Sequence, residues 1–458
     1  MKLRDKLSFL PSPAREERAE TGEVSYRDLA PPTAAPMPAV SPDNANESNA
    51  ERGGNAARSS SAAPVAGIDS DRTRVLSDLR AKIAAVLGRP QPERVLPEPS
   101  QCQLGFERVE GRRGTLYRRL ERLMPSHHVG NIPVDAASQV QGSMLALLAL
   151  DPSLSGLRFD RALYVDTETT GLGGSGVLAF LVGLCWFDTD RRAWVEQLLL
   201  RTPGDEPALL ERLHECFESC ELIVSFNGKS FDLPLLQTRC VMNRMPPLPV
   251  RPHLDLLHIA RRLHRKRLGV CRLTNLEEAV LGFGRGPDVA SADIASRYGH
   301  FLRTADEAAL EGVVLHNAWD VVSMAALVGL YGEPLGLLPA ADLVGVARTL
   351  RRGGELEYAG RVAQTAVERG AGAEALRARG DISKARGDRA AALRDYEALL
   401  GEVQDPGVHL ELVKLYEHYV KAPDRALELL DRGTGEKPEA LARRRARLER
   451  KRAKRSAG

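Results

Sequence analysis

Two carboxylates, Asp166 and Glu168, stand two residues apart in the segment Tyr164–Gly171, which reads YVDTETTG. Side chains alternate along a β-strand, so both acids are expected to project from the same face. Neighbouring carboxylates repel each other, and a bound cation is a natural way to hold them together. An edge strand carrying two solvated acids is the alternative. The apolar residues before Asp166 and the small residues after Glu168 favour the cation site.

Three further polar residues lie at positions that could serve the same chemistry. Asp232 follows the predicted buried strand 222–226 and a turn at Asn227-Gly228, in the first turn of a predicted helix. A carboxylate is favoured there by the helix dipole alone. His316 and Asp320 are four residues apart in a helical run, so they share one face. Such a pair is most often an ordinary surface pair, so each element gains weight only in combination with the others.

In this order, and with these flanking residues, the elements resemble the DEDD exonuclease superfamily. The likeness is strongest to its YprB-type ribonuclease-H-like branch of predicted nucleases, over residues from about 156 to 333. The stretches that carry it are LYVDTETTGL at 163–172, GVLAFLVGL at 176–184, IVSFNGKSFDLPLL at 223–236, LDLLHIARR at 254–262, LTNLEEAVLG at 273–282 and HNAWDVVSMAAL at 316–327. The combination of DxETTG, NGxxFD and HNxxD is specific, whereas DxE alone would not be.

The resemblance implies that Asp166, Glu168, Asp232 and Asp320 bind two divalent cations. Carboxylate ligands favour Mg²⁺ or Mn²⁺ over softer metals. The implied reaction is two-metal hydrolysis of nucleic-acid phosphodiester bonds, in DNA or RNA, with 3′–5′ exonuclease polarity. His316 lies near the general-base position. It stands four residues before Asp320, where related enzymes carry a tyrosine; a catalytic histidine usually stands five before. Whether His316 deprotonates water, orients it or only packs therefore stays open.

Two other functions fit the same residues. One is a structure-selective endonuclease or RNase that uses the same site. The other is a catalytically idle nucleic-acid-binding scaffold protein in which the C-terminal helices do the work. The presence of all four acids argues against an idle site.

Several basic or polar residues are candidates for nucleic-acid binding. Asn227 and Lys229 stand where the strand would pass, although each could simply shape the turn. Arg265 and Lys266 belong to a basic cluster between residues 261 and 272, which could bind phosphates or could be a solvated helix end. The segment 443–455 is also strongly basic and suits non-specific nucleic-acid contact, or an exposed solubilising helix. It has no aromatic residues for base stacking.

Three further acids, Asp255, Asp288 and Asp293, lie in the region that resembles the family. Asp255 begins a predicted helix, and that position explains it without chemistry. Asp288 and Asp293 are expected in a loop, and no role is assigned to them.

The elements predicted around the acids indicate an α/β domain of the ribonuclease-H-like type, with a mixed sheet flanked by helices. Strands are expected at 162–165, 177–187, 194–200 and 222–226. Helices are expected from about 206, and at 231–244, 254–266, 274–282 and 306–331.

The rest of the chain is predicted to form four other segments. Residues 1–72 are expected to be mostly disordered, because the tract 30–66 has almost no large apolar residues. Residues 73–155 are a partly helical lead-in, with one short helix at 71–88. Residues 334–440 form an all-α region, and 441–458 a basic tail. Alanines 359, 392 and 426 recur at the period of tetratricopeptide-type helix pairs, which could bind a protein partner; an irregular helical tail is the alternative.

Composition sets broad limits on this interpretation. The net charge of +3 gives no global field for nucleic acid, so binding must come from local patches. The six cysteines lack metal-type spacing; Cys216 and Cys220 are better read as small buried residues than as zinc ligands. We expect no signal peptide and no membrane partner, since the longest apolar run, 177–187, is too short to span a bilayer. A cytoplasmic protein with reduced thiols fits best.

Overall fold

A computed structural model describes residues 104–125, 127–171, 176–286, 288–332 and 334–456. The predicted disorder of residues 1–72 and the predicted helix at 71–88 lie outside the described residues. The first strand begins at Glu107 and the last helix ends at Ser456.

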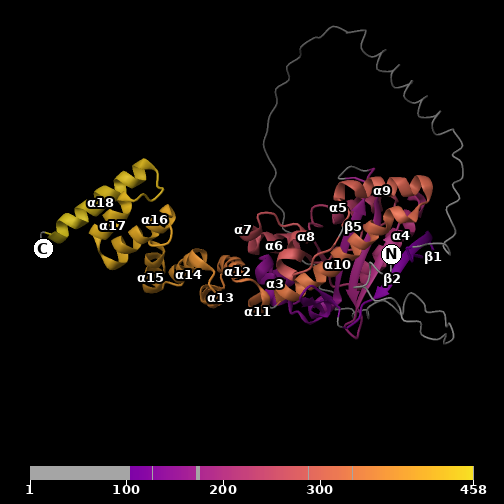
Figure 1. The fold of residues 1–458 in the computed structure, drawn as a ribbon, viewed down its shortest axis with the longest axis horizontal. Helices are drawn as coiled ribbons and strands as arrows, with labels where there is room; N and C mark the ends of the chain where they lie inside the picture. Colours follow the sequence, from indigo (N-terminus) through magenta and orange to yellow (C-terminus); the bar gives the residue numbers. More distant parts are fainter. Residues whose placement is uncertain (1–103, 126, 172–175, 287, 333, 457–458) are drawn as a thin grey trace, which may run out of the picture. The chain divides into compact units, whose positions relative to one another are not determined.

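The centre of the fold is a seven-stranded mixed sheet in the order β1-β2-β7-β6-β5-β8-β9 (Figure 1). Its strands are β1 (Glu107–Gly111), β2 (Gly114–Arg122), β5 (Ala162–Thr169), β6 (Ala179–Phe187), β7 (Ala193–Leu199), β8 (Leu222–Ser225) and β9 (His253–Asp255). The strand β5 pairs antiparallel with β6 and parallel with β8, so it lies inside the sheet. All nine residues of β6 are buried, which explains why its sequence is an uninterrupted apolar run.

The hairpin β1–β2 joins the sheet through β2 and β7, although no strand is expected there from the sequence. Most of its residues are only partly buried or exposed, because β1 is at the edge of the sheet. A partly solvated edge needs few apolar residues, and ERVEG and GTLYRRLER therefore lack a clear strand pattern. The short strands β3 (His128–Val129) and β4 (Ile132–Pro133) and the helix α3 (Gly142–Ala149) complete this lead-in.

Helices pack around the sheet, and several differ from expectation in extent. They are α4 (Glu206–Ser219), α5 (Asp232–Met242), α6 (Leu256–Leu263), α7 (Arg265–Leu268), α8 (Leu273–Leu276), α9 (Ser291–Thr304) and α10 (Glu311–Gly332), with a π-helical turn at Glu277–Leu281. The helix predicted at 254–266 is divided into α6 and α7, and β9 takes its first residues. Asp293, expected in a loop, lies in the first turn of α9.

The helix α10 is the core helix of the domain and packs against β5, β6 and β7. It is long and apolar enough to span a bilayer by length and composition, with a mean hydropathy of 1.5 over its most apolar window. However, 83% of the most apolar window is buried inside the fold. Its hydropathy is therefore accounted for by packing on both sides of the helix.

After residue 333 the described chain is helical, as predicted. Its helices are α11 (Pro334–Leu337), α12 (Ala340–Arg352), α13 (Leu356–Glu368), α14 (Gly372–Ala385), α15 (Arg389–Leu399), α16 (Pro406–Leu415), α17 (Pro423–Asp431) and α18 (Pro438–Ser456), with a π-helical turn at Tyr416–Val420. Alanines 359, 392 and 426 are fully buried, on α13, α15 and α17. A tetratricopeptide-like repeat and the predicted segment boundaries stay predictions.

The first helices of this C-terminal region are joined closely to the sheet domain. A Cβ atom on Gly345 of α12 would lie 2.5 Å from the carbonyl oxygen of Leu263 on α6, so only glycine allows this approach. Asp342, which is fully buried, lies 3.0 Å from Nδ1 of His264 and accepts two hydrogen bonds from Arg267. These contacts fix α12 against α6 and α7.

Candidate active site

The strand β5 places Asp166 and Glu168 on the face of the sheet that α10 covers. In the register with β6, Asp166 lies opposite Gly183 and Glu168 lies opposite Leu181. The Glu168 residue is only 8% exposed. The structure thus confirms that Asp166 and Glu168 project from one face of the same strand. The pair lies inside the fold rather than at a solvated edge.

The loop after β8 brings Asp232 to the same strand. Asp232 is the first residue of α5 and is 6% exposed, and it accepts a hydrogen bond from the hydroxyl of Thr167. The loop must be tight: a Cβ atom on Gly228 would lie 2.5 Å from Oγ of Ser225 and 3.2 Å from Oδ2 of Asp232. Asn227 has a φ of +72°, a conformation that asparagine tolerates better than most residues. The Asn-Gly pair is therefore needed to turn the chain towards β5.

The helix α10 contributes His316 and Asp320 from successive turns. The Nε2 atom of His316 lies 3.5 Å from the Asp320 carboxylate and 3.9 Å from the Glu168 carboxylate. Ligand atoms of Glu168, His316 and Asp320 all lie within 4.8 Å of one another, and this group could hold a metal ion. The fold therefore joins three stretches of chain in one acidic pocket.

Electrostatics in this pocket oppose the negative charges. Burial raises the pKa of Asp166 well above its usual range, and the charges of Asp320, Glu168 and Asp232 raise it further. Burial also raises the pKa of Glu168 to about 8, although His316 partly offsets this. For Asp232, burial raises the pKa to about 6 despite the hydrogen bond from Thr167. Such a cluster is stable in its charged form only with a compensating cation.

His316 is held between acids on both ring nitrogens. Its Nδ1 lies 2.7 Å from Oδ1 of Asp288, and its Nε2 faces Asp320 and Glu168. Burial lowers its pKa, but Asp320, Asp288 and Glu168 together raise it to about 9. In the metal-free protein the ring is therefore an imidazolium. Asp288, to which no role was assigned from the sequence, orients this histidine.

Arg285 is a second cation in the pocket, and nothing in the sequence singled it out. It lies in the loop between the π-helical turn and α9, and its side chain is only 4% exposed. The guanidinium binds Glu277 with two hydrogen bonds, donates to Asp320 and lies 5.5 Å from the ring centre of Trp319. These contacts fix the Arg285 side chain beside Asp320 and His316.

A buried amide network orients Asp166. The side-chain amide of Asn317 donates to Oδ2 of Asp166 at 2.9 Å, and Gln197 donates to Oδ1 of Asn317 at 3.0 Å. Asp166, Gly183 and Gln197 lie side by side on β5, β6 and β7. A Cβ atom on Gly183 would lie 2.4 Å from Oδ1 of Asn317, so the glycine makes room for the network.

With this geometry established, comparison with known proteins gives the family. The family model of the RNase_H superfamily matches residues 163–331, which include all four candidate acids. These residues belong to the RNase H superfamily. The uncharacterized protein YprB of Bacillus subtilis (strain 168) is 38% identical over 178 residues, which are 38% of this chain and 43% of that protein. The match thus spans less than half of the relative's length.

One similar solved structure is the family B DNA polymerase from the hyperthermophilic archaeon Pyrobaculum calidifontis. It is 16% identical to this chain, with a TM-score of 0.29, and the match covers 49% of this chain and 29% of the polymerase chain. This similarity is too low to argue from. The RNase H-superfamily domain, with its nuclease-type fold, therefore rests on the family match and on the relative.

The role of the amide network in orienting Asp166 can be tested by a substitution that adds one methyl group beside Asn317. We expect Gly183→Ala to displace Asn317 and to lower the affinity of the pocket for Mn²⁺ by about 10- to 100-fold, since groups that orient metal ligands have effects of this size. Gly156→Ala is the matched control, because a Cβ atom there meets nothing within 4 Å. Calorimetric titration with Mn²⁺ would measure the two variants. Equal affinity in both would show that Asn317 does not control Asp166.

The other predicted site residues lie at two different places. Asp255 is the N-cap of α6, as expected, and its carboxylate also accepts hydrogen bonds from the backbone N–H groups of Asn227 at 2.8 Å and Lys229 at 3.2 Å. It thereby holds the loop that precedes Asp232, while the Asn227 and Lys229 side chains are exposed. Arg265 and Lys266 are on α7, outside the acidic pocket, where Lys266 pairs with Glu374.

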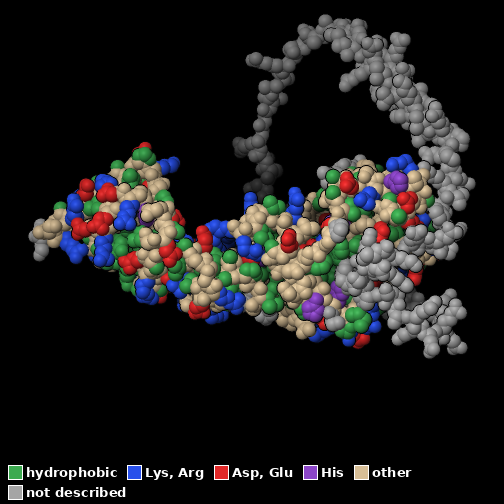
Figure 2. Space-filling view, in the orientation of Figure 1, with side chains coloured by type: hydrophobic (Ala, Val, Ile, Leu, Met, Phe, Trp, Pro, Cys, Tyr) green, Lys and Arg blue, Asp and Glu red, His purple; other side chains and the backbone are tan. Residues whose placement is uncertain are grey.

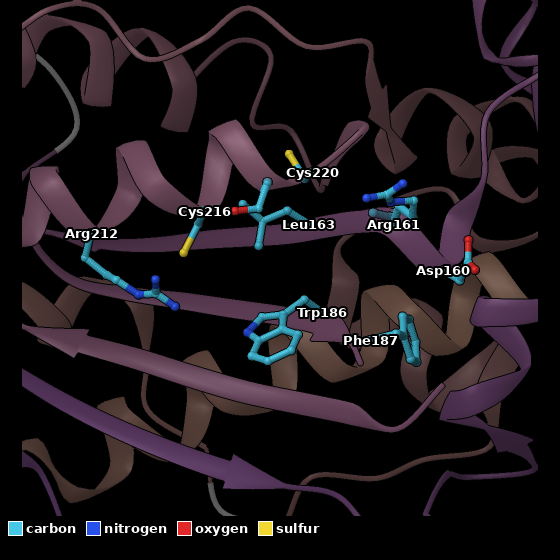
Figure 3. A pocket seen from close by; sticks show the side chains of 10 residues that line it. Asp160, Arg161, Leu163, Trp186, Phe187, Arg212, Cys216 and Cys220 are labelled. Carbon is cyan, nitrogen blue, oxygen red and sulfur yellow. The ribbon is translucent and has the colours of Figure 1, made fainter. Parts of the chain in front are cut away.

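Cys216 and Cys220 line a small cavity at the other end of β5, beside Leu163 and Trp186 (Figure 3). Its volume is about 30 Å³, which is room for about one or two water molecules. Both thiols are buried, and burial raises the pKa of Cys220 to about 12. They are therefore inert core residues, as the sequence indicated, and the cavity is too small for a substrate.

Proposed function

We propose that this chain is a metal-dependent nuclease that hydrolyses phosphodiester bonds in nucleic acid. The observation that carries the proposal is the convergence of Asp166, Glu168, Asp232 and Asp320 from three parts of an RNase H-superfamily domain. Burial, together with the charges of Asp320, Glu168 and Asp232, raises the pKa of Asp166 although His316 lowers it, so a bound cation would stabilise the charged pocket. A cleft of about 190 Å³ adjoins it and is lined by Arg285 and by three acids, Glu277, Glu278 and Asp288.

The donor atoms fit hard divalent cations. They are carboxylate oxygens, with one imidazole nitrogen nearby and no thiolate, so Mg²⁺ or Mn²⁺ is favoured over zinc. Asp166, Glu168, Asp232 and Asp320 would hold two ions. When bound, the ions supply activation of the attacking water and charge stabilisation of the leaving oxygen.

The protein's own groups supply orientation and proton transfer. Asn317 fixes the Asp166 carboxylate, and Thr167 fixes that of Asp232. Asp288 accepts a hydrogen bond from the Nδ1–H group of His316, which leaves Nε2 directed towards the acids as the proton acceptor. Once a cation balances the nearby carboxylates, the pKa of His316 falls towards the range in which imidazole can accept a proton.

A 3′–5′ exonuclease is the proposed mode, and it rests on the resemblance of the DxETTG, NGxxFD and HNxxD motifs to the DEDD superfamily. A structure-selective endonuclease or RNase would use the same residues. An end-blocked or circular substrate separates the two, because an exonuclease requires a free end.

The decisive experiment compares the full-length protein with Asp166→Asn on end-labelled single- and double-stranded DNA and RNA. Reactions contain Mg²⁺, Mn²⁺ or EDTA. We expect divalent-dependent cleavage by the wild type and a loss of at least about 1,000-fold in the variant. If no substrate is cut, or if the variant cuts equally well, the chain is not a nuclease at this site and the scaffold function gains weight.

The C-terminal helices are proposed to form a tetratricopeptide-like array that binds a protein partner. The buried alanines 359, 392 and 426, each on the second helix of a pair, support this, since small residues allow helices of a pair to pack closely. The exposed basic residues of α18 would add non-specific affinity for nucleic acid.

A further inference from the structure

A strongly basic cavity lies where the RNase H-superfamily domain meets the C-terminal helices. Its volume is about 620 Å³, and it opens between α6–α7 on one side and α12–α14 on the other. The space-filling view shows Lys and Arg side chains gathered over this region (Figure 2). Six cations and one acid line it: Arg261, Arg262, Arg265, Lys266, Arg267, Arg348 and Glu374. We refer to it as the basic groove.

The charges of the basic groove are not balanced by the protein. Arg261 and Arg265 are exposed, and their side chains have no hydrogen-bond or ion-pair partner among the described residues. Lys266 and Arg348 share the single carboxylate of Glu374. Arg267 is paired with the buried Asp342, so six cations face two carboxylates, and the excess positive potential is one that an anionic ligand would neutralise.

Helix-end electrostatics alone do not account for this arrangement. Cations at the C-terminus of α6, such as Arg261, are favoured by the helix dipole. That argument does not reach Arg348, which is in the body of another helix and faces the same cavity. The groove gathers positive charge from two separate parts of the chain.

The two walls of the groove are held in place, so the cations are preorganised. Gly345 allows α12 to contact the backbone of α6 at Leu263, and the buried Asp342 ties α12 to His264 and Arg267. A rigid site loses less entropy on binding than one assembled from mobile loops.

The helix α6 connects the basic groove to the loop that precedes Asp232. Asp255, which holds the loop before Asp232, is the N-cap of α6, and the groove is at the C-terminal end of the same helix. Eight residues of helix extend about 12 Å. A strand held in duplex geometry, whose phosphates advance ~3.4 Å per nucleotide along the helix axis, would cover that length with about four nucleotides.

We propose that the basic groove binds the phosphate backbone of the nucleic-acid substrate about four nucleotides from the bond that is cut, an inference that rests on the proposed nuclease function. Arginine predominates in the lining, and its planar guanidinium suits phosphate oxygens. The lining has no aromatic side chain on which a base could stack, so binding is independent of sequence. Substrates too short to reach the groove bind more weakly.

The test measures binding without cleavage. Full-length protein carrying Asp166→Asn is titrated with fluorescent oligothymidylate and oligouridylate at several salt concentrations. Each oligonucleotide is used as a long strand and as a short strand of about three nucleotides. The added pair Arg261→Glu and Arg265→Glu is expected to weaken binding of the long strands at least about tenfold and to reduce the salt slope by about two. The three-nucleotide strands change little. Both arginines are exposed, so folding is conserved, as melting curves would verify.

The matched control carries Arg389→Glu and Arg394→Glu, the same charge change at exposed arginines of α15 outside the groove. If the groove pair and the control pair weaken binding equally, the proposal is overturned. It also fails if a polyglutamate peptide displaces the long strand as well as an oligonucleotide does, because the occupant is then an acidic protein. If the wild type cleaves nucleic acid but the variant with Arg261→Glu and Arg265→Glu binds the long strands unchanged, only the proposal that the groove binds the substrate is refuted. Groove-dependent binding without cleavage refutes the nuclease function instead.

Discussion

Glu168→Gln is expected to make the metal-free protein more resistant to heat and at the same time to reduce its nuclease activity by at least about 1,000-fold. The two effects have one cause. Glu168 is nearly buried among Asp166, Asp232 and Asp320, and burial holds its pKa at about 8 rather than 4.5. Without a cation its charge destabilises the fold, whereas with a cation the same charge is a ligand.

The pH dependence follows from the direction of that shift. A carboxyl whose pKa is raised in the folded state destabilises the fold once it ionises, from about pH 4.5 upwards and fully above about pH 8. In EDTA, the variant should therefore melt at the same temperature as the wild type below pH 4.5 and at least about 2 °C higher near pH 8. Added Mg²⁺ or Mn²⁺ should stabilise the wild type more than the variant, as calorimetry would show.

The control for this prediction is Glu218→Gln, an identical change at an exposed glutamate of α4. It should alter neither the melting temperature in EDTA nor the activity. If Glu168→Gln lowers the metal-free melting temperature instead, the acids are held by hydrogen bonds rather than opposed by repulsion. The argument for an absent cation would then fail.

The parts of the fold that follow from sequence are those with strong local patterns. The strands β5, β6, β7 and β8 are apolar runs, and the structure places them within a few residues of their predicted ends. The ribonuclease-H-like family is confirmed by the family match, and the mixed sheet and the helical C-terminal region are confirmed as well. The strands that were missed are β1 and β2, a partly solvated hairpin on which burial imposes little pattern, and β3, β4 and β9, which are only two or three residues long.

The site shows the same division between local and distant information. Asp166 and Glu168 could be paired because alternation along one strand is a local rule. Arg285 could not be found, since its contact with Asp320 joins residues 35 positions apart and its Gly-rich surroundings, GFGRGP, read as a plain loop. Asn317 stands within a quoted motif, yet its role depends on the missing side chain of Gly183 and on Gln197. The role of Asn317 therefore follows from contacts between residues that are distant in sequence, and it could not be predicted from the order of residues along the chain.

Arg285→Met is expected to be the most destabilising single change in the site. Glu277, which is fully buried, would lose the guanidinium that binds both of its carboxylate oxygens. Removal of one partner from a buried ion pair costs about 3–5 kcal/mol, which corresponds to a fall in melting temperature of about 10 °C for a domain of this size. Arg272→Met is the matched control, because Arg272 is exposed and its side chain makes no hydrogen bond or ion pair with the described residues.

A double variant separates stability from function at this pair. Glu277→Leu combined with Arg285→Met removes both charges, so most of the lost stability should return, because apolar replacement of a buried pair is often neutral. Activity should not return. Asp320 and His316 would still lack the guanidinium that contacts them, and we expect an activity about 10- to 100-fold below wild type. Recovery of both properties would mean that Arg285 only neutralises Glu277, and that Asp320 is positioned by α10 alone. Thermal melts and single-turnover cleavage on the four proteins would decide between these outcomes.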